Sequence, residues 1–544
     1  FNGDAKLVFS MHPYSGIVDI NTDGNVQKYD LYSSSGKALF IKLKDLPGAK
    51  IDYVKTLIDF SLYFVSSFFV FLILSFITCK SGGELKNFDD SASIKSKEIF
   101  LYSIPSIAIY VVSILTFYPA QMSPDSISQW DQVINGHYKD AHPVLSTLIY
   151  SGINHIISGP QWAVLFMSIL LALTWGCALS EAICWRVNRT LVIIASILFP
   201  LFPPTFLLSS TLWKDIPFGI GLLLMSVISS HLIRRNFAFS PVVILGYIIS
   251  GLLVFGTRHN GILIIVPYFL FLYFIALQRN QKKITLAILL AQCVVFVLTK
   301  TLLISALQAG GIGNHYRSIY GLHVLGAMQE AGVPWNEKER EVISNILPDS
   351  AWKDGYRCDT VVTLFWHKDI SWKYMGDHYS DINALAFKSI FEHPLIFARH
   401  QLCVTSMVWR INPLANEFIA FTPLEITKMP EADVLGLKMY SKLPVFNTYV
   451  KNFTANYLSA HSEWVRPAGY LLLGAFLTFI LWFKCGWRAM LIFSPALLNS
   501  ASWILLSGSQ DYRYMWPVVL ITMYLALLAT GRPVHQNKKL PVGG

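Results

Sequence analysis

The apolar segment 99–118, IFLYSIPSIAIYVVSILTFY, and the polar stretch after it, 122-MSPDSISQW-130 followed by 140-DAHP-143, decide how this chain folds. About 20 apolar residues are enough to cross a bilayer as a helix. Two carboxylates, Asp125 and Asp140, then stand with His142 and Trp130 directly beyond that segment. An acid, an imidazole and an aromatic ring at a membrane surface are a candidate for chemistry, so the rest of the chain must distinguish a catalytic loop from a hydrated one.

The composition is that of an integral membrane protein. Of 544 residues, 53% are hydrophobic and 14% are charged, whereas soluble proteins carry about 25% charged residues. The net charge of +10 lies mostly in short loops between apolar segments, where it reports membrane orientation instead of nucleic-acid binding. No Walker loop or GxGxxG motif occurs in the sequence, so nothing points to a nucleotide or to an ATP-driven transporter.

About eleven segments are long and apolar enough to span a bilayer. Lys and Arg gather in the loops on one side of them, which the positive-inside rule assigns to the cytoplasm. The first external loop, 119–160, then faces outward. The predicted spans are 55–79, 99–118, 161–183, 190–206, 216–233, 240–256, 261–278, 284–306, 466–483, 489–507 and 515–531.

The spans divide the chain into five parts. Short alternating runs in 1–50 predict a small external β segment, and we expect sequence ahead of Phe1, because an outward N-terminus needs a preceding span or a cleaved signal. Region 307–465 is too long for a loop and carries helical patterns, which predict a mostly helical external domain. The parts are 1–50, the membrane core 51–306, the external domain 307–465, the second membrane core part 466–531 and a cytoplasmic tail 532–544.

Two features of the external domain bear on its role. Its aromatic and basic side chains suit a surface that lies against lipid headgroups or one that grips sugars. Its two cysteines, Cys358 and Cys403, lack metal-ligand spacing and are expected to pair in an oxidising compartment. The aromatic and basic residues are Trp366, His367, Trp372, Tyr374, His378 and Tyr379.

Each of the predicted outward loops carries ionisable residues directly beside a span. Asp125 follows the second span, Lys214 precedes the fifth, Arg258 lies between the sixth and seventh, and Arg513 precedes the last. Ionisable residues at such depths are functional candidates. A carboxylate can accept a proton from an attacking hydroxyl, and guanidinium groups match phosphate oxygens. The pattern favours displacement at a sugar carbon with a lipid phosphate as leaving group.

Simpler interpretations exist for the same residues. Asp125 can lie near the N-cap of a helix that begins at Ser126, and His142 can cap a helix over 143–157. Lys214 can extend to the membrane surface and pair with Asp215, and Arg513 can pair with Asp511. Arg258 is harder to explain in this way, because an outward arginine in a tight turn runs against the positive-inside trend.

These residues resemble a family. The motifs Ser123-Pro124-Asp125-Ser126, His142-Pro143, Lys214-Asp215-Ile216-Pro217, Arg258-His259-Asn260-Gly261 and Arg513-Tyr514 look like those of the GT-C glycosyltransferases. These are polytopic enzymes that use polyprenyl-phosphate sugars, and the likeness is greatest to bacterial serotype-converting O-antigen glucosyltransferases. The resemblance covers about 99–531. It implies an acidic catalytic residue in the first external loop, a cationic set for the carrier phosphate and an inverting displacement.

The resemblance assigns roles to particular residues. Asp125 is expected to be the general base, with Asp140 as the alternative, and Asp140 and His142 are expected to position the acceptor or tune the base. Lys214, Arg258 and Arg513, with His259 and Tyr514, are expected to bind the donor phosphate. Acceptor positioning is assigned to Gln129, Trp130 and Asp215. The Asp-x-Asp pattern of some relatives is absent, so neither a divalent metal nor another cofactor is implied.

The resulting hypothesis is a glycosyltransferase of the bacterial inner membrane with a periplasmic active site. It would move a hexose such as glucose from undecaprenyl phosphate to an O-antigen or other lipopolysaccharide precursor, and serotype conversion would follow. Its partners would be the donor, a lipid-linked acceptor, the bilayer, a companion flippase and a sugar-phosphate synthase. The alternatives are a lipid-linked glycan flippase, an O-antigen ligase or polymerase, and a membrane scaffold. The one-sided polar cluster argues against a flippase, and the Asp-rich first external loop argues against a ligase.

Overall fold

The computed structural model describes residues 5–11, 17–22, 25–30, 37–43, 93–277, 281–413, 421–458 and 462–531. The chain divides into two compact units, Phe1–Phe68 and Phe69–Gly544. The first contains two antiparallel strand pairs, and three of its four strands coincide with the alternating runs of the sequence. The pairs are β1 (Ala5–Met11) with β4 (Lys37–Leu43), and β2 (Ile17–Thr22) with β3 (Asn25–Asp30).

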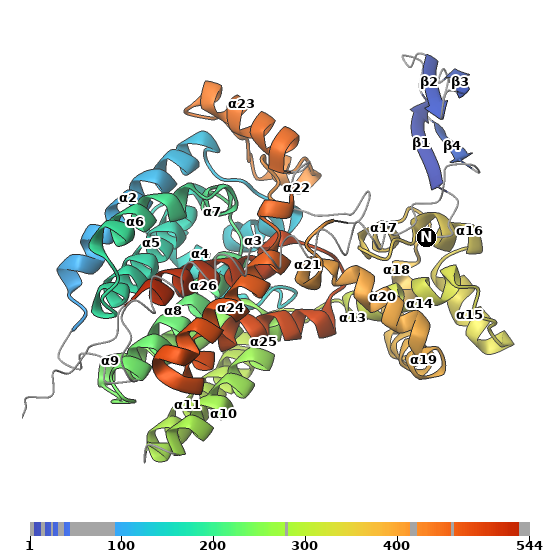
Figure 1. Ribbon diagram of the computed structural model, residues 1–544. Helices are drawn as coiled ribbons and strands as arrows, with labels where there is room; N and C mark the ends of the chain where they lie inside the picture. The colour runs from blue at the N-terminus through green and yellow to red at the C-terminus, as the bar shows by residue number, and fades with distance from the viewer. Residues whose placement is uncertain are drawn as a thin grey trace, which may run out of the picture. The chain divides into compact units, whose positions relative to one another are not determined.

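The second unit is helical, and every predicted span from 99–118 onward coincides with a helix (Figure 1). The span predicted at 55–79 and the tail 532–544 lie outside the described residues. The helices are α2 (Ser96–Thr116), α5 (Pro160–Cys184), α6 (Arg189–Leu201), α8 (Asp215–Arg234), α9 (Pro241–Thr257), α10 (Ile262–Leu277), α11 (Lys282–Leu298), α24 (Pro467–Cys485), α25 (Met490–Leu506) and α26 (Tyr512–Thr530).

The chain is a polytopic α-helical membrane protein, as predicted. Within the described residues, 7 helical stretches are long and apolar enough to cross a membrane. One of them, Pro467–Leu506, contains both α24 and α25, while α6 and α9 are apolar but shorter. The total of about eleven spans stays a prediction.

Two predicted spans depart from a single regular α-helix, for different reasons. The span predicted at 190–206 ends at Leu201, and α7 (Pro203–Leu208) begins after it, because consecutive prolines remove backbone donors and block continuation of a helix. The span at 284–306 is continuous but changes winding: the π-helix η2 (Thr299–Leu303) and the short α12 (Ile304–Ala306) extend α11. Such π-turns often mark functional positions in helices.

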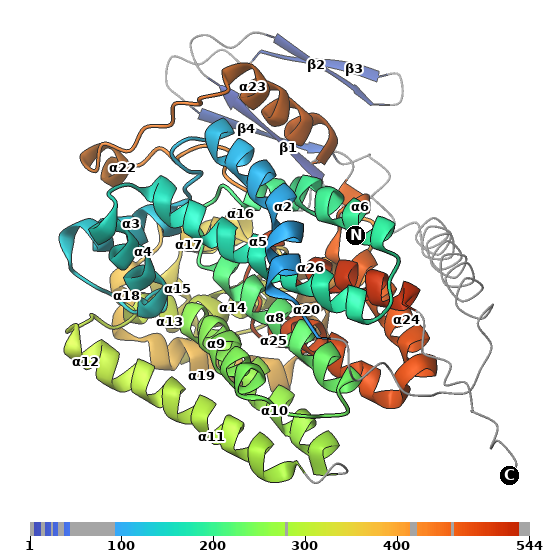
Figure 2. The same cartoon turned by 90° about the vertical axis from the view of Figure 1, so that its left-hand side faces the viewer.

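Helix α8 lies at the centre of the membrane body. It packs against α5, α9, α25 and α26, and Figure 2 shows α11 at the edge of the same body. Its residues are apolar all round, which is typical of a buried helix. Gly219 allows the close approach of α26, since a Cβ there would lie 2.8 Å from the Trp516 ring. The N-terminal half of α8 is thereby packed closely against α26.

Region 307–465 folds mainly as short helices, with part of it around a second hydrophobic core that includes Leu325, Trp352 and Ile382. Between residues 379 and 409 the helix is divided at His393, ahead of Pro394, and again at Thr405. The helices are α13 (Asn314–Arg317), α14 (Ile319–Glu330), α15 (Glu337–Ile346), α16 (Asp349–Gly355), α17 (Val362–Phe365), α18 (Trp372–Asp377), α19 (Tyr379–Glu392), α20 (Pro394–Val404), α21 (Ser406–Trp409), α22 (Pro430–Val434) and α23 (Pro444–Phe453).

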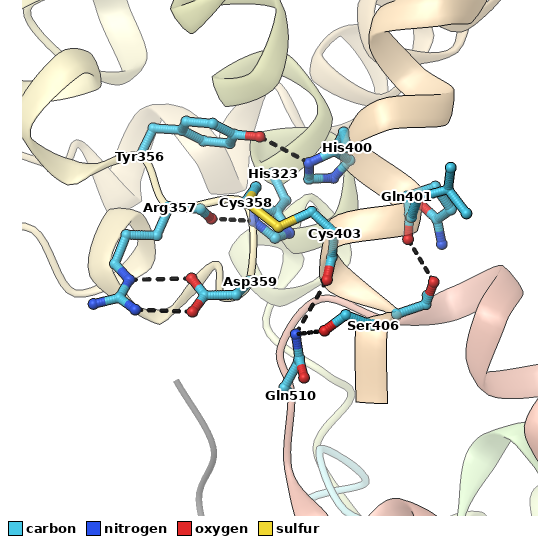
Figure 3. Close-up of a disulfide and its surroundings, with 12 residues drawn as sticks. His323, Tyr356, Arg357, Cys358, Asp359, His400, Gln401, Cys403, Ser406 and Gln510 are labelled. Atoms are coloured by element: carbon cyan, nitrogen blue, oxygen red, sulfur yellow. Dashed lines mark hydrogen bonds and ion pairs between the residues drawn. A yellow bond between two sulfur atoms is a disulfide. The ribbon is translucent and has the colours of Figure 1, made fainter. Parts of the chain in front are cut away.

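The predicted cysteine pair is confirmed. Cys358 and Cys403 form a disulfide with a Cα–Cα distance of 5.7 Å (Figure 3). It joins the loop before α17 to the end of α20, 45 residues later. The disulfide therefore ties together two segments of the external domain that the sequence keeps far apart.

Candidate active site

The first external loop folds into two helices, α3 (Pro124–Asn135) and α4 (Val144–Ile156). Pro124 is the first residue of α3, where its fixed φ and missing N–H suit a helix start. Ser123 precedes it, and its backbone N–H donates to Ser126 Oγ at 3.3 Å. Trp213 Nε1 donates to Ser123 Oγ at 2.7 Å, which fixes the start of α3 against the loop before α8. Asp125 thus lies in the first turn of α3, close to the expected cap.

The Asp125 carboxylate lies among three basic side chains from distant parts of the chain. Its Oδ2 accepts from Arg513 Nη2 at 3.1 Å and from Lys214 Nζ at 3.4 Å. Its Oδ1 lies 3.7 Å from His142 Nε2. The Asp125 side chain is 34% exposed, whereas those of Lys214 and Arg513 are 11% and 9% exposed. Asp125 is therefore the most exposed of these side chains, and Lys214 and Arg513 lie largely buried around it.

A second carboxylate, that of Asp215, contacts both Arg258 and Arg513. It is fully buried at the start of α8, and its Oδ1 lies 2.5 Å from Arg258 Nη1. Its Oδ2 lies 3.6 Å from Arg513 Nη1. The guanidinium carbons also lie over aromatic rings: that of Arg258 is 4.1 Å from the Tyr514 centroid and that of Arg513 is 4.4 Å from the Trp213 centroid. Such contacts hold cations in place.

A third carboxylate, Asp511, completes the set and had been predicted only as an ordinary ion-pair partner. Its Oδ2 lies 2.8 Å from Arg513 Nε, and its Oδ1 accepts from the backbone N–H of Arg513 at 3.2 Å. Each of the three guanidinium nitrogens of Arg513 therefore lies near a different carboxylate. A single arginine links Asp125, Asp215 and Asp511.

The charges shift the pKa values of the open groups. Burial raises the pKa of Asp125, but the attraction of Lys214 and Arg513 outweighs it, and the pKa is held well below its usual value. Burial, with Lys214 close by, lowers the pKa of His142 to about 3. Burial raises the pKa of Asp511 to about 6 against the attraction of Arg513. Near neutral pH, Asp125 is ionised and His142 is neutral.

Asp140 and His259 form a cluster of their own. Lys300 Nζ donates to the Asp140 carboxylate at 3.0 and 3.2 Å and lies 3.0 Å from His259 Nδ1. His259 Nε2 lies 3.1 Å from the Asp140 carbonyl oxygen. Lys300 belongs to the π-helix η2. The Asp140 carboxylate is therefore engaged by Lys300, whereas Asp125 holds the position between Lys214, Arg513 and His142.

The three residues assigned to the acceptor are buried. Gln129 Nε2 donates to Ser146 Oγ at 2.8 Å and to Thr147 Oγ1 at 3.1 Å, which joins α3 to α4. Trp130 is buried in the hydrophobic core, and Asp215 contacts Arg258 and Arg513. These contacts give each residue a structural part, and their assignment to the acceptor stays a prediction.

Trp213 and Lys300 were not predicted from the sequence as site residues, and Asp511 was predicted only as an ion-pair partner of Arg513. Trp213 looks like an interfacial tryptophan until the packing shows Ser123 and Arg513 against it. Lys300 could have been found by the same reasoning as Arg258, because a cation near the predicted outward end of a span opposes the positive-inside trend. Within the described part of the chain, no group of three or more His, Cys, Asp or Glu side chains is arranged to hold a metal ion.

No protein-family model matches this chain, and no curated protein matches it. Among solved structures, it is similar to the crystal structure of ArnT from Cupriavidus metallidurans bound to undecaprenyl phosphate. The sequence identity is 13%, the TM-score is 0.31, and the likeness covers 79% of this chain and 76% of that one. Likeness at this level assigns no residue a role, so the function is argued below from the site itself.

Proposed function

We propose that this protein is a membrane glycosyltransferase that moves a sugar from a polyprenyl-phosphate carrier to a glycan acceptor. The observation that carries the proposal is Asp125, a partly exposed carboxylate at the end of the membrane helices, between the largely buried cations Lys214 and Arg513. A base beside an anion-binding wall suits a reaction in which a hydroxyl attacks and a phosphate leaves.

The reaction is a single displacement at the anomeric carbon. The bond between that carbon and the carrier phosphate breaks as the bond to the acceptor oxygen forms, and the hydroxyl proton passes to Asp125. The electron pair of the broken bond leaves on the phosphate. Lys214, Arg258 and Arg513 stabilise the charge that develops there, and His142, which is neutral, lies beside the other carboxylate oxygen of Asp125, 3.7 Å from it.

The electrostatics suggest how the donor activates its own base. Asp125 contacts both Lys214 and Arg513. It is therefore a weak base, because the two cations hold its pKa down. A phosphate that binds these two cations takes over part of their interaction with Asp125. The pKa of Asp125 then rises toward its ordinary range when the donor is present, which limits proton removal to the loaded enzyme.

The acceptor is proposed to contact aromatic rings of the external domain. Trp366 and Trp372 are exposed, with ring centroids 5.1 Å apart. The exposed Tyr316 of α13 lies 5.4 Å from the Phe365 ring, measured between centroids, and Phe365 contacts both tryptophans. Flat apolar ring faces suit a sugar, whose ring has an apolar face and a polar edge.

The finer assignment rests on the sequence. The donor is proposed to be undecaprenyl phosphate carrying a hexose such as glucose, and the acceptor a precursor of O-antigen or a related surface polysaccharide. The orientation from the Lys and Arg distribution puts the site on the periplasmic face of the inner membrane. Serotype conversion would be the biological result.

The test is a transfer assay with the purified protein and a panel of undecaprenyl-phosphate sugars, each with and without a polysaccharide acceptor. We expect acceptor-dependent release of the carrier from one sugar and a glycosylated product of matching mass. Movement of labelled donor across proteoliposome membranes without such release would instead identify a flippase. Transfer of a whole preassembled glycan chain would identify a ligase.

A further inference from the structure

A short segment, residues 507–511, links α25 to α26 and is called the strap here. It ends two residues before Arg513, and Asp511 is the N-cap of α26. Arg513 lies in the first turn of α26, so the position of the helix start determines where its guanidinium group can reach. The position of the strap therefore sets how Arg513 meets Asp125.

The external domain holds the strap along one side. Val361 N–H donates to the Gly508 carbonyl at 2.7 Å, and Gln510 N–H donates to the Asp359 carbonyl at 3.2 Å. The hydroxyls of Thr360 and Ser509 lie 2.8 Å apart. Residues 359–361 thus form a short bridge with the strap, immediately after Cys358.

The Gln510 side chain contacts a second segment of the external domain, at Cys403 and Ser406. It is fully buried, and its Nε2 donates to the Cys403 carbonyl at 3.1 Å and to Ser406 Oγ at 2.8 Å (Figure 3). Ser406 also accepts from Arg466 Nη2 at 3.2 Å, so this wall is itself fixed. Gln510 lies between two segments of the external domain.

The disulfide joins those two segments. Cys358 immediately precedes the first, and Cys403 supplies the carbonyl of the second. Both cysteines are half-buried, so a small reductant can reach them. Without the bond, the two segments stay connected through the Tyr356–His400 hydrogen bond at 2.9 Å and through their packing on α14. The covalent link next to Gln510 is lost, and the separation that its backbone and side-chain hydrogen bonds require is held less tightly.

We propose that Gln510 is a positioning residue for Arg513, and that the Cys358–Cys403 disulfide keeps it in place, so that only the oxidised protein binds the carrier phosphate at full strength. The proposal rests on the function proposed above but concerns binding alone. Full donor affinity would thereby be confined to an oxidising compartment, and reduction would weaken binding by displacing Arg513, although every residue that contacts the phosphate is still present.

The test measures the Kd for undecaprenyl phosphate in detergent-solubilised full-length protein, oxidised and after treatment with a thiol reductant. We expect reduction and the Gln510→Leu substitution each to weaken binding about tenfold, the effect of losing one or two buried hydrogen bonds. The two changes should not multiply when combined, because both act through the same contact.

Gln292→Leu is the matched control, since Gln292 is also buried and its Nε2 donates to the Tyr247 carbonyl at 2.6 Å, away from the strap. It should lower the melting temperature and leave the Kd unchanged. If Gln510→Leu does not fold, the Cys358→Ala/Cys403→Ala double variant and Thr360→Val take its place. An unchanged Kd in reduced, folded protein overturns the proposal. Loss of sugar transfer with normal phosphate binding would count against the proposed function instead.

Discussion

Each end of α8 carries a cluster of buried charged side chains, and the two clusters are built differently. At the N-terminal end, which is predicted to face outward, Asp215 meets Arg258 and Arg513, and Arg513 also reaches the partly exposed Asp125. At the other end, Arg234 donates to the buried Glu181 carboxylate from Nε at 2.7 Å and from Nη2 at 3.0 Å. With 20 residues, α8 is about 30 Å long, so the clusters lie about one membrane thickness apart.

The difference lies in how completely each cluster is paired. Glu181 is enclosed, and it also accepts from Trp185 Nε1 at 3.0 Å and lies 3.1 Å from His231 Nδ1. In the outward cluster, Asp215 Oδ2 and Arg513 Nη1 are buried without a hydrogen-bond partner, and Asp125 is open to solvent. Complete pairing is typical of a structural lock, while incomplete pairing beside an open acid is typical of a binding site.

This contrast also bears on the flippase alternative. The sequence suggested spans almost free of charge, but Glu181 lies within α5 and Arg234 at the end of α8. A transporter needs a polar site that opens to each side in turn. The enclosed Glu181–Arg234 pair favours a lock at the inner end and chemistry at the outer end.

The largest effect is expected from Asp125→Asn. Removing the base should lower the transfer rate by about 10²–10⁴-fold and leave the melting temperature close to that of the wild type, because the carboxylate is partly exposed. Steady-state transfer assays and thermal unfolding measure the two. Asp131→Asn on the same helix is the control and should transfer normally. Full activity in Asp125→Asn would remove Asp125 as the base.

Arg234→Leu should have the opposite profile. It leaves the Glu181 charge buried without its main partner, which should cost about 3–5 kcal/mol of stability. Thermal unfolding in detergent measures the loss, and Arg235→Leu, one residue further on, should change stability little. If Arg234→Leu unfolds at the wild-type temperature but loses transfer, the inner cluster is functional and the comparison is wrong.

A smaller effect is expected from Arg258→Lys. Lysine keeps the positive charge against Asp215 but lacks the planar fork that fits phosphate oxygens. The KM for the donor should rise about tenfold, while the KM for the acceptor and the stability should change little. Kinetics with the two substrates varied separately measure this split. An equal rise in both KM values would argue against a phosphate contact.

The smallest effect is a pH dependence at Asp511. Since burial raises the pKa of Asp511 to about 6, the group gains a proton as the pH falls through that value. The cluster then loses one negative charge, so binding of the anionic donor should tighten from pH 7 to pH 5, by at most about tenfold per pH unit. Titration of the donor Kd measures it, and Asp511→Asn should flatten the profile. Weaker binding at pH 5 would contradict this sign.

Hydrophobic length found most of the helices, because spans of about 20 apolar residues leave few alternatives. It did not find the break after Leu201 or the π-turn at Lys300, which depend on local backbone hydrogen bonding. Charge position along the chain brought Asp125, Lys214, Arg258 and Arg513 to one side, and the structure places all four in one site. Gln510 was not identified because its partners Cys403 and Ser406 lie more than 100 positions earlier in the chain. Asp511 was expected to pair with Arg513, but the sequence did not show that Arg513 also reaches Asp125 and Asp215.

Sequence also could not separate Asp125 from Asp140, since both acids lie in the same loop. The structure separates them by their partners: Lys300 engages Asp140, and the cationic wall of Lys214 and Arg513 engages Asp125. The burial of Gln129 and Trp130 could not be predicted for a related reason. An amphipathic helix such as α3 has a buried face, and the sequence did not show that these two residues lie on it.

The central claim is that the outward end of α8 cleaves the bond between a sugar and a carrier phosphate. A single-turnover reaction followed by ³¹P NMR tests it most directly, with undecaprenyl-phosphate glucose, a polysaccharide acceptor and an excess of protein. The account predicts that the phosphodiester signal of the donor is replaced by the phosphomonoester signal of the free carrier with wild-type protein, and that it persists with Asp125→Asn. Conversion at the same rate by Asp125→Asn, or no conversion of any sugar carrier in the panel by the wild type, would contradict it.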